Sequence, residues 1–205
     1  MGVYDVVKDF EERVAEYAGA NYGVAVNSCT NALMLSMFFR RVFDSYSGSV
    51  TIPAETYVGV AYSVINAGLE INFSHEKWKG AYTIEPIDVI DSALRFKRNM
   101  YVNGSLYCVS FHDKKVLPVC DGGMILTNNI VEYEILRRMR YDGRKPGVSV
   151  FDDNFTLPGF HCHMKPDVAA RGLMLMDAVK DYNRDLECEY PDLSKYEIFE
   201  GSNGW

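Results

Sequence analysis

The chain has 205 residues, a length typical of a single domain. Its composition, 48% hydrophobic and 24% charged, is that of a globular protein. The net charge of −7 argues against a basic surface for nucleic acid or an anionic membrane, so we expect no nucleic-acid partner. No stretch approaches the roughly 18 consecutive apolar residues of a membrane helix, so we expect no membrane span.

The five cysteines are odd in number, widely scattered and without a Cys-x-x-Cys pair. This pattern is typical of reduced thiols, so we expect a cytoplasmic protein. His161, Cys162 and His163 offer nitrogen and sulfur ligands, and so do His112 and Cys120. We nevertheless expect no metal site, because no second paired motif exists and because we place His161 and His163 on opposite sides of an extended segment.

Apolar residues at helical and strand spacing alternate along the chain. An amphipathic helix is predicted over residues 4–18, where Gly19 stops it. Strands are predicted over residues 22–28, 49–54, 69–73, 88–92, 105–111 and 123–129. The remaining helices are predicted over residues 30–43, 57–68, 130–143 and 165–186.

Short apolar strands that alternate with helices favour an α/β fold with three layers, in which helices cover both faces of a mainly parallel sheet. In such sheets ligands bind beyond the carboxyl ends of the strands. The polar residues that follow each strand are therefore the candidates for a site.

The first polar cluster lies in "NSCTNALM", where a helix begins within three residues of a strand end. The free N–H groups and the dipole of such a helix attract an anion, and the hydroxyls of Ser28 and Thr30 add donors. The same two hydroxyls could instead only cap the helix. The segment is not a P-loop, because it lacks the glycines and the lysine of that motif.

Three further strand ends carry polar groups. Tyr57 could stack on a flat ligand or simply pack at the rim of the core. Asp91 is costly to bury at the end of an apolar strand unless a cation meets it, although it could cap the next turn. Lys114 and Lys115 follow the strand that ends at Ser110; one of them could be a nucleophilic amine, or both could lie in a solvated turn.

Together, these four features match the needs of pyridoxal 5'-phosphate. Its phosphate binds a helix N-terminus and its ring needs a stacking partner. Its ring nitrogen pairs with an aspartate, and its aldehyde forms a Schiff base with a lysine. The combination is more specific than any of its parts.

Six segments also carry a resemblance to a known family. They are "FEERVAEYAGANYGVAVNSCTNAL", "VTIPAETYVGVAYSVINAG", "VIDSA", "SFHDKKVLPVCDGGMILTN", "LRRMRYDGR" and "PGFHCHMKPDVAARGLMLMD". In order and spacing, over most of residues 8–180, they resemble the DegT/DnrJ/EryC1/StrS family of pyridoxal-phosphate aminotransferases, which act mainly on nucleotide-linked keto sugars. The fourth segment is the most specific.

The resemblance implies the large domain of a fold-type I pyridoxal-phosphate transferase. It implies a Schiff base on Lys115 rather than Lys114, and Asp91 as the partner of the pyridinium nitrogen. The other residues that the resemblance places at the cofactor are Cys29, Thr30, Asn31, Tyr57, Ser110, His161 and His163. The two histidines stand where the family commonly has Asn or Arg, and would reach the phosphate of the partner subunit in a homodimer with shared active sites.

The chain departs from the family in several places. Cys29 stands where Gly or Ala is usual, and Leu94 stands where a polar residue usually packs on the cofactor. The stretch between Phe73 and Val89 is shorter than in the family, which has a further strand and helix there. Because the chain stops at Trp205, we expect residues 1–205 to form a single cofactor-binding large domain without the C-terminal small domain.

We therefore expect a pyridoxal-phosphate-dependent aminotransferase that moves an amino group from an amino acid to a keto sugar, and the resemblance implies a nucleotide-linked sugar. Related dehydratases carry histidine in place of the lysine, so Lys115 favours amino transfer. The alternative is a truncated, non-catalytic or accessory homologue that binds the cofactor without turnover.

Overall fold

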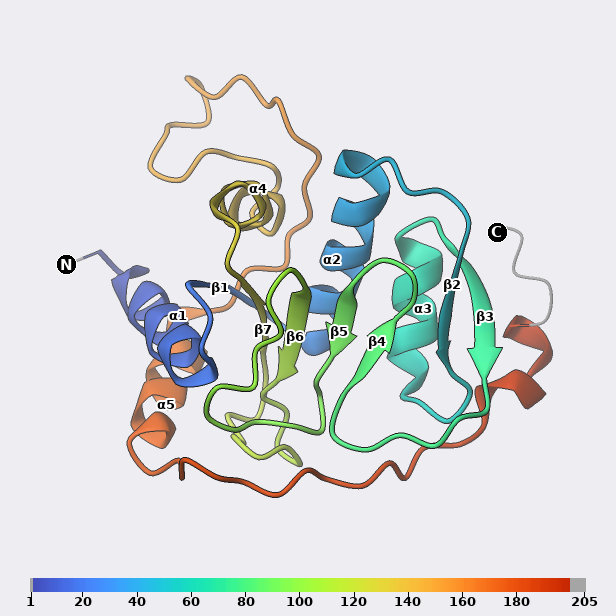
Figure 1. Cartoon of the computed structure of the whole chain (residues 1–205). Helices are drawn as coiled ribbons and strands as arrows, with labels where there is room; N and C mark the ends of the chain where they lie inside the picture. Colours follow the sequence, from blue (N-terminus) through green and yellow to red (C-terminus); the bar gives the residue numbers. More distant parts are fainter. Residues whose placement is uncertain (1, 200–205) are drawn as a thin grey trace.

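A mixed sheet forms the centre of the computed structural model, which describes residues 2–199 (Figure 1). Its five hydrogen-bonded strands lie in the order β1 (Tyr22–Val26), β7 (Gly123–Thr127), β6 (Leu106–Ser110), β5 (Val89–Asp91) and β4 (Tyr82–Ile84). A parallel pair, β2 (Ser49–Pro53) and β3 (Glu70–Ser74), extends this sheet, because the amide of Thr51 donates to the carbonyl of Glu85 at 2.9 Å.

Two strands run against the others. The pairs β5–β6 and β2–β3 are parallel, whereas β1–β7, β6–β7 and β4–β5 are antiparallel. Only four residues join β4 to β5, too few for the crossover that parallel neighbours need, and β7 returns beside β6 without an intervening helix. The α/β prediction is confirmed, and the other five strands share one direction and end at one edge of the sheet.

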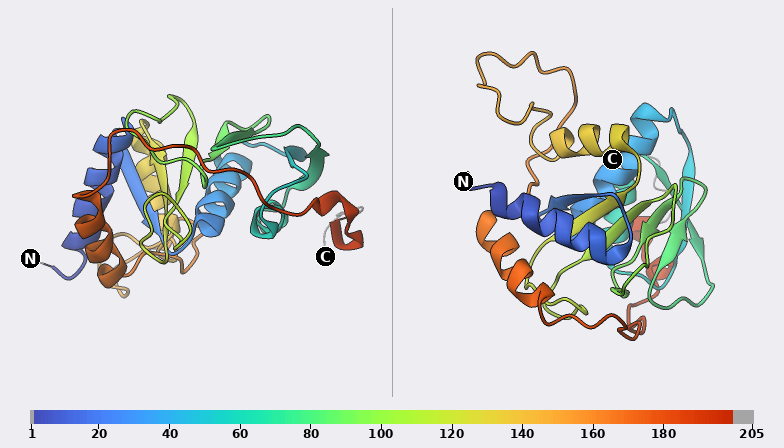
Figure 2. Two further views of the ribbon diagram at one scale, coloured as in Figure 1. Left: turned by 90° about the horizontal axis from the view of Figure 1, so that it is seen from below. Right: turned by 60° about the vertical axis from the view of Figure 1, so that its left-hand side comes forward.

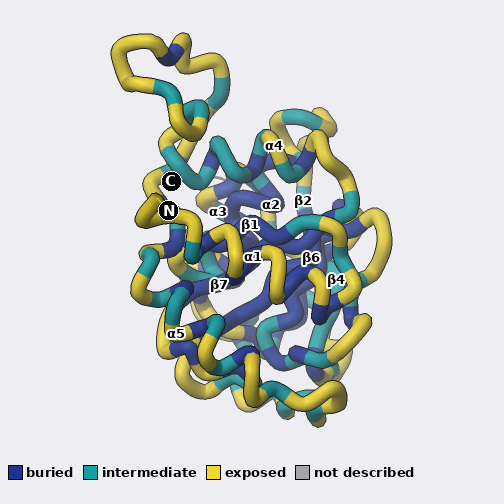
Figure 3. The backbone as a smooth tube through the Cα atoms, turned by 90° about the vertical axis from the view of Figure 1, so that its left-hand side faces the viewer, coloured by how far each residue is buried: buried dark blue, intermediate teal, exposed yellow. Residues whose placement is uncertain are grey.

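Helices cover both faces of the sheet (Figure 2). One face packs on α1 (Asp5–Ala18) and α5 (Pro166–Met176), and the other packs on α2 (Cys29–Phe43), α3 (Val58–Asn66) and α4 (Ile130–Met139). The strands divide between the two cores residue by residue: Leu106 and Cys108 face the α2 side, whereas Tyr107 and Val109 face the α1 side. Figure 3 shows these buried strands beneath a largely exposed outer layer.

The C-terminal part differs from the prediction. The last helix ends at Met176 rather than near residue 186, and the chain then continues mostly in extended form, with two short 3-10 turns at Leu193–Lys195 and Glu197–Phe199. Asn183 accounts for part of this difference, because its side-chain amide donates to the backbone carbonyls of Phe96 and Lys180, and such bonds compete with helix formation. We call residues 177–199 the strap: it crosses beneath the carboxyl ends of the strands (Figures 1 and 2).

Two further observations complete the fold. Strand β4 was not predicted; it lies in the short stretch between Phe73 and Val89. Over residues 2–199, no helix combines the length and the apolar character needed to cross a bilayer.

Candidate active site

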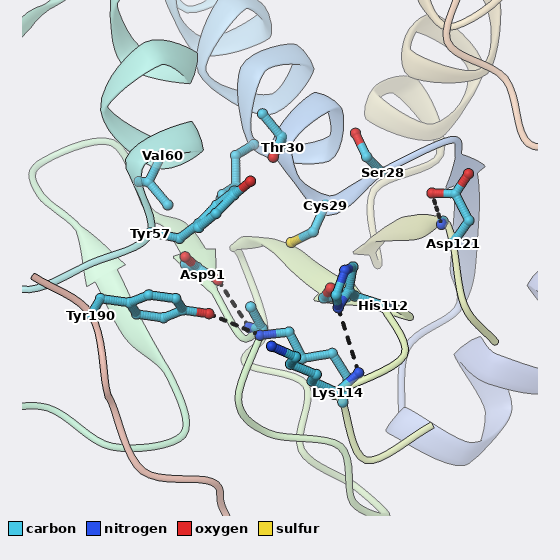
Figure 4. Close-up of a pocket in the computed structure, with 15 residues that line it drawn as sticks. Ser28, Cys29, Thr30, Tyr57, Val60, Asp91, His112, Lys114, Asp121 and Tyr190 are labelled. Atoms are coloured by element: carbon cyan, nitrogen blue, oxygen red, sulfur yellow. Dashed lines mark hydrogen bonds between the residues drawn. The ribbon is translucent and has the colours of Figure 1, made fainter. Parts of the chain in front are cut away.

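A pocket of about 320 Å³ opens beyond the carboxyl ends of the strands, beneath the start of α2 (Figure 4). Its lining comes from six segments of the chain. The lining residues are Ser28, Cys29, Thr30, Leu33, Tyr57, Val60, Asp91, Ala93, Ser110, His112, Lys114, Lys115, Asp121, Gly122 and Tyr190. The structure thus brings together six of the predicted site residues.

The start of α2 presents free backbone amides to this pocket. Ser28 is the N-cap, and its hydroxyl accepts a hydrogen bond from the amide of Asn31 at 3.1 Å. The capping interpretation of Ser28 is therefore confirmed, but capping leaves the first amides of the helix, those of Cys29 and Thr30, without intrahelical acceptors. With the positive end of the helix dipole behind them, these amides form an anion site. The side chain of Asn31 does not join them, because it donates to Asn27 at 2.7 Å outside the pocket.

The glycine pair of "CDGG" allows β7 to run directly under this helix start. A Cβ atom on Gly123 would lie 2.5 Å from the amide nitrogen of Cys29, so only glycine fits. Gly122 has a φ of +104°, which other residues rarely adopt. These two glycines place the helix amides next to the end of β6, where Ser110 lines the pocket.

Asp91 is a buried carboxylate at the end of β5, only 2% exposed. One of its oxygens accepts from the amide of Ala93 and the other from the hydroxyl of Tyr82, both at 2.9 Å. Tyr82 in turn contacts Thr56 at 2.9 Å. Burial raises the pKa of Asp91, while the two hydrogen bonds and the positive charge of Lys115 oppose that rise. A cation placed at this carboxylate would relieve the cost of its burial.

The thiol of Cys29 faces the same space. Burial raises its pKa well above the ordinary value, and the neighbouring Asp91 and Cys108 raise it further. The thiol is therefore protonated at neutral pH and is a poor nucleophile. The amines that line the pocket are those of Lys114 and Lys115.

Both lysines line the pocket, but they differ in exposure. Lys114 is exposed, whereas Lys115 is half-buried, and its Nζ lies 3.1 Å from the hydroxyl of Tyr190. Tyr57 forms the adjacent wall, with its ring centroid 5.8 Å from that of Tyr190. Figure 4 shows Tyr57, Cys29 and Asp91 arranged around the pocket, which Lys115 also lines.

His161 and His163 lie outside this pocket. They were placed on opposite sides of an extended segment, and this is wrong: their rings meet edge to face with centroids 4.8 Å apart, because alternate residues of an extended segment share a face. His163 lines a second cavity, with Tyr4 and Arg140. Within residues 2–199, no three His, Cys, Asp or Glu side chains cluster closely enough to hold a metal ion.

The pattern of the DegT/DnrJ/EryC1/StrS aminotransferase family matches residues 1–86 and 98–187. The chain belongs to this family. Asp91 falls in the gap of that match, so its assignment depends on its position in the pocket. No protein with a curated description matches the sequence significantly.

Several solved enzyme structures share the fold of this chain. The sugar aminotransferase CalS13 from Micromonospora echinospora superposes with a TM-score of 0.75 at 17% identity, over 85% of this chain and 60% of that one. Helicobacter pylori PseC, an aminotransferase of pseudoaminic acid biosynthesis, gives 0.68 at 17% identity, over 86% and 62%. A GDP-4-keto-6-deoxymannose-3-dehydratase gives 0.68 at 18% identity, over 85% and 61%. The chain therefore spans about three-fifths of the length of these structures.

Sequence reasoning missed two residues of the site. Tyr82 donates to Asp91 from β4, and Tyr190 reaches Lys115 from the strap. Tyr190 lies beyond the family match, which ends at residue 187. Neither tyrosine stands in a motif, so the sequence carried no signal for them.

Proposed function

We propose that this family member is a pyridoxal-phosphate-dependent aminotransferase that acts on a keto sugar carried by a nucleotide. The observation that supports this proposal is the convergence in one pocket of the free amides of α2, a buried carboxylate, an aromatic wall and a half-buried lysine. These groups fit the phosphate, the ring nitrogen, the ring face and the aldehyde of the cofactor.

Each residue has a defined part in this proposal. The amides of Cys29 and Thr30 and the hydroxyl of Ser110 would hold the phosphate, and Tyr57 would cover the ring. Lys115 would hold the cofactor covalently through a Schiff base at its Nζ.

Pyridoxal phosphate supplies an electron sink that lets an amino group pass between a donor and a keto acceptor. Asp91 would keep a proton on the ring nitrogen, and its burial next to this cation would become favourable. The Nζ amine of Lys115, when it is not bonded to the cofactor, would carry a proton between the carbon that gives up the amino group and the carbon that receives it.

The substrate class is proposed from the named relatives. CalS13 is a sugar aminotransferase, and the solved structure of DesI contains a TDP-sugar product. We further propose a cytoplasmic homodimer, in which His161 and His163 reach the partner's phosphate site. The loop after α4, whose Phe151 is 94% exposed, projects from the domain and is available for such an interface (Figure 3).

A cofactor-binding protein without turnover is the second candidate. It is favoured by the strap, which crosses the pocket and brings Tyr190 to Lys115. Both candidates require cofactor binding, and they differ only in turnover.

The decisive experiment mixes the purified protein with pyridoxal phosphate and records the visible absorbance of the bound cofactor. We expect a protein-bound band that is absent in Lys115→Ala and retained in the matched control Lys114→Ala. Absence of the band from the unaltered protein would refute both candidates. The protein is then incubated with a keto-sugar nucleotide and glutamate, and the products are analysed by mass spectrometry. This distinguishes the two candidates, because only the aminotransferase yields the aminated sugar.

A further inference from the structure

The strap is fastened to the domain on both sides of the pocket. On one side Asp185 forms an ion pair with Arg95 at 2.8 Å, and the amide of Leu186 donates to Leu94 at 2.9 Å. On the other side the amide of Leu193 donates to Ala54 at 2.8 Å, and the Leu193 side chain is buried in the α2 core. These contacts fix the segment between them across the mouth of the pocket.

Tyr190 lies in this central part of the strap and points into the pocket (Figure 4). Its hydroxyl accepts a hydrogen bond from Nζ of Lys115 at 3.1 Å, and Nζ lies 5.8 Å from the centroid of its ring. The neighbouring strap residue Cys188 donates to the carbonyl of Glu55 at 3.2 Å, which holds this stretch of the strap against the end of β2.

The amine of Lys115 needs a hydrogen-bond partner to hold it in one position. A lysine side chain has four rotatable bonds, so its amine has no fixed position unless a partner holds it. Among the residues that the structure describes, Tyr190 is the hydrogen-bond partner of this amine. A tyrosine side chain has only two rotatable bonds and is already held by the strap, so it directs Nζ into the pocket at a small entropic cost.

We propose that Tyr190 is a positioning residue of the active site, which the strap supplies, and that it holds the amine of Lys115 in the orientation that captures the cofactor. This proposal rests on the proposed function for the identity of the cofactor. The contact itself joins two side chains of this protein and can be tested without the cofactor.

The first arm of the test uses no cofactor. The lysines of the purified protein are labelled with a limiting amount of acetic anhydride, and mass spectrometry measures the rate at each lysine. In Tyr190→Phe, which keeps the ring but removes the hydroxyl, we expect labelling of Lys115 to rise about two- to ten-fold, the factor for one hydrogen bond. Lys114 should label at an unchanged rate, and so should both lysines in the control Tyr196→Phe, another strap tyrosine that is 51% exposed.

The second arm follows the rate at which pyridoxal phosphate is captured, by stopped-flow absorbance across a range of pH. We expect Tyr190→Phe to slow capture by a similar factor, with an unchanged melting temperature, and Tyr196→Phe to match the unaltered protein. Equal labelling of Lys115 in Tyr190→Phe and the unaltered protein would overturn the proposal. Failure of the unaltered protein to capture any cofactor would instead overturn the proposed function, and the first arm would still decide the contact.

Discussion

The most demanding prediction concerns Gly123, where β7 passes beneath the start of α2. An added Cβ atom would lie 2.5 Å from the amide nitrogen of Cys29, 2.6 Å from the carbonyl carbon of Ser28 and 2.7 Å from the Cα atom of Cys29. All three neighbours are backbone atoms, so no side-chain rotation relieves the clash. To reach ordinary contact at 3.4 Å, the strand and the helix must separate by about 0.9 Å.

Gly123→Ala therefore displaces the amides that are proposed to hold the phosphate. Overpacking of this size costs about 1–3 kcal/mol of the free energy of unfolding. For a domain of this size each kcal/mol corresponds to about 2–4 °C in the melting temperature. Because a displacement of about 1 Å at a reacting site can cost about 100-fold, we expect the affinity for pyridoxal phosphate to fall by at least ten-fold.

Gly104→Ala is the matched control. Gly104 has a φ of +88° and no atom within 4 Å of an added Cβ, so the substitution strains only the local backbone. It should cost about 1–2 kcal/mol of stability and leave cofactor affinity unchanged. Thermal denaturation and absorbance titration with pyridoxal phosphate measure both quantities. If Gly123→Ala binds the cofactor as tightly as Gly104→Ala does, the phosphate does not lie at the start of α2.

Two other changes follow from the electrostatics. Burial raises the pKa of Asp91, so without cofactor the protein loses stability as the pH rises past the ordinary carboxyl pKa of 3.8. Asp91→Asn should therefore be more stable than the unaltered protein by about 1 kcal/mol at pH 7, equally stable in acid, and weaker in cofactor binding. An Asp91→Asn variant that is less stable at pH 7 would contradict this. The hydrogen bond from Arg95 lowers the pKa of Asp185, whose stabilising contribution is lost as the pH falls through its lowered pKa. Asp185→Asn should cost on the order of 1 kcal/mol and speed limited proteolysis within the strap, whereas unchanged cleavage would show that this ion pair does not fasten it.

The sequence predicted most elements because their boundaries are marked locally. Gly19 ends α1 in the left-handed conformation that glycine favours, and Pro166 opens α5 in its first turn. The prediction failed where tertiary contacts decide the structure. The three-residue strand β4 has too little periodicity to detect, and the polar segment after Met176 follows side-chain to backbone bonds rather than a helix.

The site was predicted to the same degree and for the same reason. Asp91 ends β5 and Lys115 follows β6, and because strands of one direction end at one edge, their sequence positions imply proximity. The position of Asn31 did not follow, since its side-chain amide donates to Asn27 outside the pocket. Tyr190 follows no strand at all, and only the path of the strap brings it to the pocket.

The departures from the family bear on one question, which is how the pocket is closed. A reaction of this class needs water excluded around the reacting amine, because low local polarity strengthens each electrostatic contact. The match leaves about two-fifths of the CalS13 chain uncovered. In this chain the strap crosses the pocket and brings Tyr190 to Lys115. The strap is fastened by an ion pair at Asp185 and by burial of the side chain at Leu193, so both ends hold Tyr190 at the pocket. The single ring of Tyr190 thus connects the closure of the pocket to the position of the amine.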